Sequence, residues 1–545
     1  MEMNRMYGSK ESTASHEVVA VSLDRDTLAL ARAGKKAVLK RRFGLTSMIG
    51  FACSIMITWE GMIVNMGLAL ENGGPAGLLY GALITWLGTL CVFITMGELS
   101  SMLPTAGGQY HWASILAPGP SKQVLSYITG WITVAAWVAA PTAAAYLTAT
   151  LMQELISLNI PAYQPQGWHG TLIMWAVLVL AVVLNTLLGP LLPVMELLFL
   201  SLHVLGFFAV LIPLVNLAPH GNSHDIWTTF NDGGNWGSKG LAFFLGLQGN
   251  AAALLETTLT RSKQMAEEVK SADSNVAKSM VLAVVINGAT GFAMLVAFMY
   301  SAGPIDELLK SESQYPFIDI IANGTGSNGA AAVLVSIIIV MNFCATVSAI
   351  SSGSRMIWSF SRDQGLPFWK YLRRVGRKNS IPTLAVIVVV TCAALLGLIQ
   401  IGSSTAFNDV ISLVLEGFFA SYLCVLLPLL YHRIKGNIAD PEVDGNEIFF
   451  VDESSTPNKP FMWGPWRVKG IFGILNNAIA CIYLIVVGFF SFWPPGKGPT
   501  AESMNYSSLV LGAVAIGSFV YYLVWARKTY SGPIVEVEAQ RLRQG

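Results

Sequence analysis

Five ionisable side chains interrupt apolar stretches of this 545-residue sequence, and their types could do chemistry: Glu60, Glu196, His203, Glu256 and Glu416. Charged groups inside a membrane are costly and usually mark a solute pathway or a proton relay. Glu60 and Glu416 lie deepest, and both a functional and a structural role stay open for them. Glu196, one turn into its stretch, is interpreted as an interfacial residue. His203 is interpreted as a hydrogen-bonded packing residue rather than a proton relay.

Small residues gather in the first apolar stretch, which reads S-M-I-G-F-A-C-S-I-M-I-T-W-E-G over residues 47–61. Such a pattern is typical of a helix-packing face, because small residues let two helices approach closely. It is equally typical of a discontinuous helix, whose exposed backbone groups can bind a zwitterion and an ion. The residues alone leave both interpretations open.

Several chemistries find no support in the sequence. The six cysteines all lie in apolar stretches without close pairs or a neighbouring His, so they are interpreted as small buried hydrophobes. A membrane enzyme would need clustered His, Asp or Cys ligands, and an ATP-driven pump would need a phosphate-binding loop. Neither pattern is found. We therefore expect no enzyme, no cofactor and no metal, and the net charge of +1 gives no reason to expect a nucleic-acid partner.

The elements that must position these residues are membrane-spanning helices. Hydrophobic residues make up 53% of the chain and charged residues 12%, with a mean hydropathy of +0.56; soluble proteins carry roughly 25% charged residues. In lipid the backbone must satisfy its own hydrogen bonds, and apolar runs of about 20 residues select helices. The sequence predicts an all-α integral membrane protein with about twelve spans: 46–67, 76–99, 125–151, 171–188, 192–216, 241–258, 279–302, 331–355, 382–402, 409–432, 470–492 and 506–526.

The positive charges predict the orientation. With both termini in the cytoplasm, only Lys239, Lys310 and Lys497 fall in outside loops, and every other Lys and Arg lies inside. The predicted regions are a largely disordered cytoplasmic tail (1–42), a ten-helix core (43–432), a cytoplasmic loop (433–469), two further helices (470–528) and a cytoplasmic tail (529–545). The N-glycosylation sequons at Asn323 and Asn505 would both lie outside. We expect a multi-pass protein of the plasma membrane or of a vacuolar or other internal membrane.

Three motifs occur in order along the chain. They are E-L-S-S-M-L-P-T-A-G-G-Q-Y-H-W at 98–112, M-A-E-E-V-K-S-A at 265–272, and S-R-M-I-W-S-F-S-R-D-Q-G-L-P at 354–367, the last followed by N-S-I-P at 379–382. The set resembles the signature of the amino acid–polyamine–organocation transporter superfamily. It is most similar to the fungal amino acid/choline branch, which includes choline, GABA and other amino acid permeases. The resemblance covers about residues 40 to 530.

This resemblance implies a LeuT-like core of two inverted five-helix repeats, followed by two C-terminal helices, with the first and sixth helices broken at the midplane. Around the first break it implies a substrate-binding site, for which the candidates are Gly50, Ser54, Ile55, Met56, Trp59, Glu60, Trp137 and Glu416. Thr346 and Ser348, on the eighth helix, are the candidates for holding a coupling ion.

The implied function is secondary active transport of a small nitrogenous solute, such as an amino acid, GABA, choline or a related amine or alkaloid. Protons are the candidate coupling partner. Aromatic faces (Trp59, Trp137) and buried carboxylates (Glu60, Glu416) favour a cationic or zwitterionic solute, since an ammonium over an aromatic ring gains about 0.5–2 kcal/mol. A nutrient sensor on a permease fold and an exporter of a secondary-metabolite amine are the alternatives.

The sixth stretch departs from the family pattern. Where relatives have a glycine-centred break, residues 256–264 read E-T-T-L-T-R-S-K-Q, which places two cations in the expected lower half of the helix. Three explanations stay open: a reshaped site that uses Glu256 as a counter-ion, an unbroken and inactive helix, or an error in the gene model across this stretch.

Overall fold

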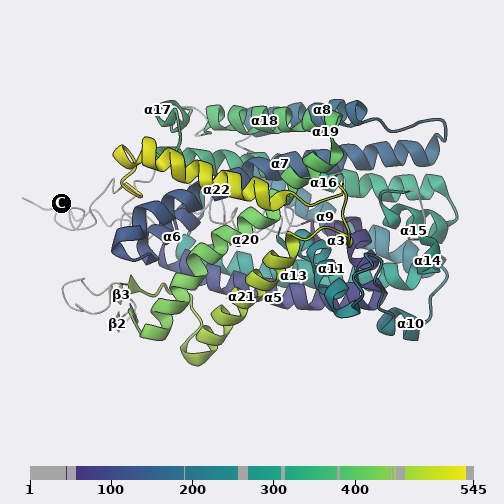
Figure 1. The fold of residues 1–545 in the computed structure, drawn as a ribbon, viewed down its shortest axis with the longest axis horizontal. Helices are drawn as coiled ribbons and strands as arrows, with labels where there is room; N and C mark the ends of the chain where they lie inside the picture. Colours follow the sequence, from purple (N-terminus) through teal and green to yellow (C-terminus); the bar gives the residue numbers. More distant parts are fainter. Residues whose placement is uncertain are drawn as a thin grey trace, which may run out of the picture.

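The computed structural model describes residues 44–45, 57–188, 191–255, 268–308, 313–376, 381–440, 442–444, 447–449, 461–501 and 503–534. Long helices dominate this part of the chain (Figure 1). Ten helical segments of the described chain are long and apolar enough to cross a membrane. They are built from α5 (Gly74–Met102), η1 (Gly119–Ser121) with α7 (Lys122–Asn159), α8 (Gly167–Leu187), α9 (Leu192–Leu217), α13 (Ala272–Ser301), α16 (Asn328–Arg362), α18 (Thr383–Gly397) with α19 (Ile399–Gly402), α20 (Ser404–Lys435), α21 (Gly470–Ser491) and α22 (Ser507–Val524).

The other two expected spans border undescribed residues. The stretch 46–67 corresponds in its second half to α3 (Thr58–Val64), which is followed by α4 (Met66–Glu71), and the stretch 241–258 corresponds to α11 (Lys239–Leu255). The prediction of an all-α membrane fold is confirmed. The N-terminal tail (1–42), residues 535–545 of the C-terminal tail and the altered stretch 256–264 lie outside the described residues, and the domain boundaries stay predictions.

Short elements connect the long helices at both ends of the bundle. One end carries α6 (Gln109–Leu116), α17 (Trp369–Leu372) and η4 (Ala526–Lys528), together with two small strand pairs. The opposite end carries α10 (Ser223–Thr228), α14 (Ile305–Leu308) and α15 (Pro316–Thr325). The strand pairs are β1 (Ile438–Ala439) with β4 (Phe461–Met462), and β2 (Glu442–Asp444) with β3 (Glu447–Phe449).

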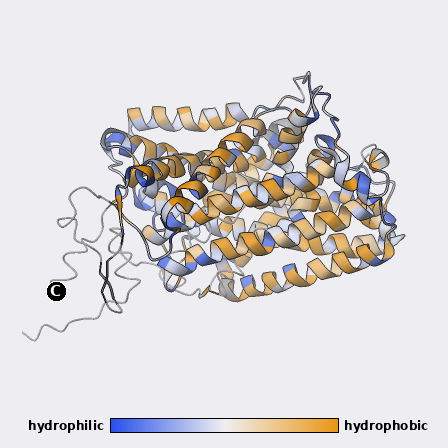
Figure 2. Ribbon diagram, turned by 90° about the horizontal axis from the view of Figure 1, so that it is seen from below, coloured by the Kyte–Doolittle hydropathy of each residue, from blue (hydrophilic) through white to orange (hydrophobic). Residues whose placement is uncertain are grey.

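Successive long helices run in alternating directions, so the loops after them fall at one end and then at the other (Figure 1). Of the described Lys and Arg residues, Lys239 and Lys497 lie at the end that carries α15, and the others lie at the end that carries α6. We call the α6 end the basic end. Between the two ends the helices are dominated by apolar residues (Figure 2). Large apolar side chains point outward from α8, α9, α18 and α22, as lipid contact requires.

The two halves of the core pack through equivalent helices. α3 packs on α11, α5 on α13, and α7 on α16, so that the first, second and third helices of one half meet their counterparts in the other. This is the pattern that two inverted repeats around a common axis would produce. The α7–α16 contact is close because position 353 is glycine: a Cβ there would lie 2.8 Å from the Trp137 carbonyl oxygen. Helices α21 and α22 pack outside, against α5, α7 and α20.

The described residues that follow α22 pack into the basic end. Tyr530 follows α22 and is almost fully buried, with its ring packed against Tyr127 and Phe360. Its hydroxyl lies 2.6 Å from the Ser126 hydroxyl. A little further on, the Ile534 N–H donates to an Asp363 carboxylate oxygen at 2.9 Å. The last described residues therefore tie α7 to the end of α16.

Candidate functional site

Helix α3 presents the first two candidate side chains. Ile57, just before it, has φ of 32° in the left-handed region, which does not belong to a right-handed helix, and α3 begins at Thr58. Trp59 and Glu60 then lie in its first turn, and both are fully buried. The other four candidates of the first stretch, Gly50, Ser54, Ile55 and Met56, lie outside the described residues, and their role stays a prediction.

Glu60 forms a buried acid–base pair with His203. Its Oε1 lies 2.9 Å from Nδ1 of the imidazole, and the two side chains are 0% and 2% exposed. The Trp59 indole N–H donates to the His203 carbonyl oxygen at 3.2 Å, and the two rings lie 6.0 Å apart. The start of α3 is thus joined to the middle of α9. His203 is hydrogen-bonded as expected, but its partner is a carboxylate, which reopens the proton-relay interpretation.

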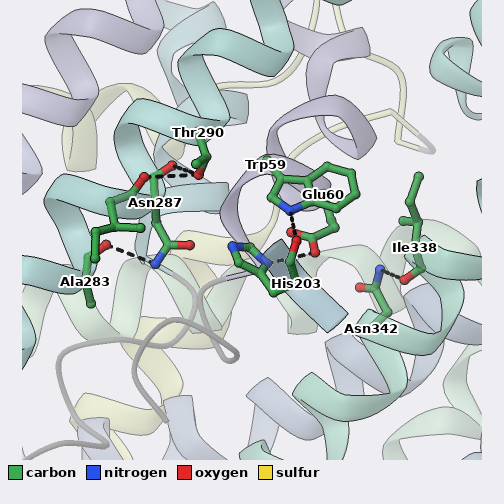
Figure 3. Close-up of polar contacts among 9 residues, drawn as sticks. Trp59, Glu60, His203, Ala283, Asn287, Thr290, Ile338 and Asn342 are labelled. Carbon is green, nitrogen blue, oxygen red and sulfur yellow. Dashed lines mark hydrogen bonds and ion pairs between the residues drawn. The ribbon is translucent and has the colours of Figure 1, made fainter. Parts of the chain in front are cut away.

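Two asparagines lie on either side of this pair. Asn287 comes from the middle of α13 and Asn342 from the middle of α16. Figure 3 shows His203 between Glu60 and Asn287, and Glu60 between His203 and Asn342. The two amide nitrogens donate within their own helices, to the Ala283 oxygen at 2.9 Å and the Ile338 oxygen at 3.0 Å. Because a carbonyl oxygen can only accept, each amide must turn its nitrogen toward it, which leaves the Oδ1 atoms for other partners.

Four buried polar atoms of this cluster have no hydrogen-bond partner among the described residues: Glu60 Oε2, His203 Nε2, Asn287 Oδ1 and Asn342 Oδ1. An unsatisfied buried polar atom costs about 1–3 kcal/mol, and such atoms are few in native proteins. We call Glu60, His203, Asn287 and Asn342 the central polar cluster.

A second carboxylate lies near the start of α9. Glu196 is fully buried, and it accepts a hydrogen bond from the Ser348 hydroxyl of α16 at 2.8 Å. The interpretation of Glu196 as an interfacial residue is therefore wrong, because its helix packs this face inward against α16. Ser348, a candidate for a coupling ion, donates to this carboxylate. Thr346, the other candidate, donates to the Asn342 carbonyl oxygen of its own helix at 3.0 Å. The ion-binding role of both stays a prediction.

The motif residues meet at the basic end. The Tyr110 hydroxyl, from the first motif, donates to Asp363 of the third at 2.7 Å. Burial, and then the neighbouring Asp363 carboxylate, raise the pKa of Tyr110 well above its usual value, so the hydroxyl stays protonated and donates. Glu268, from the second motif, pairs with Arg355 at 2.6 Å. These contacts bring three motifs that are far apart in the sequence together at the basic end.

A further pair at the basic end joins α5 to α20. Glu98 is fully buried and accepts from the Arg433 guanidinium at 2.5 Å and from the Val468 N–H at 2.8 Å. Arg433 also lies over the Trp463 ring, 4.6 Å from its centroid. The segment that follows β4 is therefore held against the ends of both helices.

A model of the family described as amino acid permease matches residues 43–516. The chain belongs to this amino acid permease family. Among its relatives is a putative amino acid/polyamine transporter of Macrophomina phaseolina, 28% identical over 466 residues, which cover 85% of this chain and 97% of the relative. The choline transporter of Saccharomyces cerevisiae is 27% identical over 511 residues, covering 93% and 85%. The GABA-specific permease of the same yeast is 26% identical over 520 residues, covering 93% and 86%.

Family membership confirms the resemblance inferred from the three motifs. It also confirms that a transporter, and not an enzyme, is the right class. The relatives carry names of different solutes, so membership alone does not choose among them. Among the described residues, no group of three His, Cys, Asp or Glu side chains is placed to hold a metal ion.

Two candidates of this permease lie on α7 and α20. Trp137 is buried, and its ring meets Phe418 of α20 edge-on at 5.2 Å. Glu416, two residues earlier on α20, accepts a hydrogen bond from the Ser507 hydroxyl at the start of α22. These contacts differ from those of Trp59 and Glu60, which are made with α9. A cavity shared by all four residues stays a prediction.

Sequence reasoning missed the two asparagines of the central polar cluster. It considered ionisable groups inside apolar stretches and passed over neutral amides, although an unpaired amide in lipid is also costly. Asn287 and Asn342 each stand near the middle of a long apolar helix, and that position was the available signal.

Proposed function

We propose that this chain is a secondary transporter of a small cationic or zwitterionic nitrogenous solute. The observation that carries the proposal is the Glu60–His203 pair, which is buried at the start of α3 within a bundle of membrane-spanning helices. A buried pair of this kind is weak evidence for stability, because desolvation offsets the attraction between the partners. In a membrane protein such a pair is more often retained for function.

The start of α3 supports a solute site there. The left-handed Ile57 stands directly before α3 and follows the residues expected to bind solute, and Trp59 and Glu60 come next in the chain. A carboxylate attracts an ammonium, and an indole face adds to that attraction. The relatives named for amino acids, polyamines, choline and GABA all concern nitrogenous solutes. Amino acids, GABA, choline and related amines or alkaloids are therefore the solutes to test.

The positive charges support the orientation. The basic end would face the cytoplasm, which places both termini there, in the plasma membrane or in a vacuolar or other internal membrane. Asn323 would then lie on the outer side, where it is exposed on α15.

Uptake of labelled amino acids, GABA, choline and polyamines into a permease-deficient fungal strain tests the proposal. Wild type should accumulate at least one of them, and Glu60→Gln at equal surface abundance should reduce its uptake about tenfold or more. Glu71→Gln is the matched control, because Glu71 is an exposed carboxylate one helix further along and should leave uptake unchanged.

Two other results would point elsewhere. Unchanged solute accumulation in cells that nevertheless signal in response to the solute would favour the sensor. Loss of preloaded amine from vesicles, without uptake by cells, would favour the exporter. Uptake by Glu60→Gln at the wild-type rate would remove Glu60 from the site.

A further inference from the structure

A short, strongly basic segment follows α16 at the basic end. Between Gln364 and Pro382 the sequence contains five Lys and Arg residues and neither Asp nor Glu. Three of these cations, Lys370, Arg373 and Arg374, lie in or directly after α17, and all three are exposed. Clusters of about four to eight cations beside a membrane-spanning helix are typical of segments that bind anionic lipids.

The three cations of α17 lie over aromatic rings. The Arg373 guanidinium is 4.8 Å from the centroid of the Trp369 ring, and the Lys370 ammonium is 5.7 Å from a ring centroid of the same residue. The Arg374 guanidinium is 5.1 Å from the centroid of the Tyr371 ring. An aromatic face attracts a cation without neutralising its charge, so all three positive charges persist.

No carboxylate compensates these charges within the described part of the chain. The ion pairs found there involve none of the three cations. The preceding acidic residue, Asp363, is fully buried, and its two oxygens accept from the Tyr110 hydroxyl and the Ile534 N–H. A ligand for α17 should therefore bring negative charge of its own.

Two aromatic side chains of the same segment are exposed. Phe368, just before α17, has φ of 56°, a left-handed conformation that bulky residues rarely adopt, and its side chain is 79% exposed. Tyr371 is 54% exposed. Aromatic rings at the edge of a membrane commonly lie at the level of the lipid headgroups. We call Phe368, Lys370, Tyr371, Arg373 and Arg374 the α17 surface.

The α17 surface borders a lipid-facing helix. α17 packs against α16 and α18, and Figure 1 shows it beyond the basic end of α18, along the same edge of the bundle. In the first turns of α18, Leu384 and Ile387 point outward and are 40% and 50% exposed, as lipid contact requires. The α17 surface thus lies where the hydrocarbon beside α18 would give way to lipid headgroups.

Backbone contacts hold the α17 surface in place. The Trp358 indole N–H of α16 donates to the Arg373 carbonyl oxygen at 3.1 Å, and Leu372 is buried beneath the surface. The Gly376 N–H donates to the Ile381 carbonyl oxygen at 3.0 Å, which joins the segment after α17 to the start of α18. A surface that is already ordered loses less entropy when it binds a ligand.

We propose that the α17 surface binds the headgroup of an anionic phospholipid in the leaflet at the basic end. Lys370, Arg373 and Arg374 contact the negatively charged headgroup, where a guanidinium can donate two hydrogen bonds to one phosphate. Phe368 and Tyr371 lie against the glycerol and the upper acyl chains. The proposal requires only that the chain spans a membrane, so it depends neither on the transported solute nor on the direction of transport.

The two kinds of side chain favour a lipid over a soluble anion. A free phosphate or an acidic peptide would match the charge of the three cations but would leave Phe368 and Tyr371 in water. A phospholipid covers the aromatic rings with its apolar part and the cations with its headgroup, as amphipathic segments at membrane surfaces require.

Native mass spectrometry of the purified full-length protein in a non-ionic detergent measures this binding. Phosphatidylserine and phosphatidylcholine with identical acyl chains are titrated separately, and the ratio of the dissociation constants for the first bound lipid gives the headgroup preference. Wild type should prefer phosphatidylserine about tenfold or more, since each cation near an anionic lipid contributes about fivefold. Inorganic phosphate or a polyglutamate peptide, added at constant ionic strength, should not displace the bound phosphatidylserine.

Charge-removing variants locate the site. Replacing Lys370, Arg373 and Arg374 together by Gln should bring the two lipids to within about threefold of equal affinity. Lys370→Gln with Arg374→Gln leaves Arg373 in place and should give an intermediate preference, which decides the matter if the triple variant does not fold. The matched control removes three other exposed cations of the basic end by Lys122→Gln, Lys270→Gln and Lys278→Gln, and it should keep the wild-type preference.

Four results would overturn the proposal. Equal affinity of wild type for the two lipids would remove the anionic preference, and an unchanged preference in the α17 variants would place it elsewhere. An equal loss in the control would assign it to the general charge of the basic end. Displacement of phosphatidylserine by inorganic phosphate or by polyglutamate would make the occupant a soluble anion.

Discussion

Glu98 and Glu60 are both completely buried carboxylates in the core of this permease, and they are satisfied very differently. Both oxygens of Glu98 are bonded, one to Arg433 and the other to the Val468 N–H. Glu60 uses one oxygen for His203 and leaves the other without a partner among the described residues. Complete satisfaction fixes a structure, whereas an incomplete set of bonds leaves two arrangements close in energy. The comparison sets a carboxylate that closes the basic end beside one whose second oxygen has no partner among the described residues.

The largest difference in stability should appear when glutamine replaces the glutamate at each of the two sites. An amide has a single acceptor oxygen, so Glu98→Gln deprives either Arg433 or the Val468 N–H of its partner and removes the balancing charge. Breaking a buried pair in this way costs about 3–5 kcal/mol. Glu60→Gln instead keeps the bond to His203 and places a donor where an orphaned oxygen stood, so stability should be equal or higher. Thermal unfolding in detergent measures both, and a greater loss for Glu60→Gln would reverse the comparison.

Exchanging the charges of Glu268 and Arg355 tests whether ion pairs hold the basic end together. Glu268→Arg or Arg355→Glu alone places like charges together where a 2.6 Å bond existed. The double variant should recover about 1–3 kcal/mol relative to the sum of the single effects, as expected for residues in direct contact. Surface abundance and melting temperature of the four proteins give the coupling. Strict additivity would mean that the pair contributes nothing to closing this end.

Asn342→Leu should separate stability from activity at the centre. The substitution removes an unsatisfied oxygen from an apolar helix at similar side-chain volume, so stability should stay level or rise by up to about 1 kcal/mol. Uptake of labelled solute should nevertheless fall severalfold, since one acceptor of the central polar cluster is gone. Ser336→Leu on the lipid-exposed side of the same helix is the control. A marked drop in melting temperature would show that Asn342 has a structural partner.

The smallest expected effect on the protein is that of losing a glycosylation site at the end of the bundle that carries α15. Asn323 is exposed, whereas the Asn505 amide donates to the Ser491 and Trp493 carbonyl oxygens and is held against the bundle. We expect a glycosidase-sensitive shift in gel mobility that Asn323→Gln abolishes and Asn505→Gln leaves in place, with uptake unchanged in both. A shift that depends on Asn505 would mean that this amide is free of its backbone contacts before it packs.

The sequence predicted the spans and the charged end well, and it singled out Glu60. The length of an apolar stretch and the sign of the charges beside it are properties of neighbouring residues. Both can therefore be predicted without knowing which helices pack together. The pairing of Glu60 with His203 could not be predicted. The two residues are 143 positions apart, and nothing in the sequence around either one identifies the other as its partner. Glu196 was misjudged for the same reason: depth along a helix does not tell which face meets α16.

The placement of Tyr530 has a consequence for the biosynthesis of this permease. The ribosome delivers Tyr530 only after every membrane helix has been made, yet its ring completes the aromatic contacts among Tyr127 and Phe360 and its hydroxyl reaches Ser126. Until then Ser126 and Tyr127 of α7 and Phe360 of α16 lack these contacts at the basic end. The aromatic packing that joins α7 to the end of α16 therefore forms only after α22 has been synthesised.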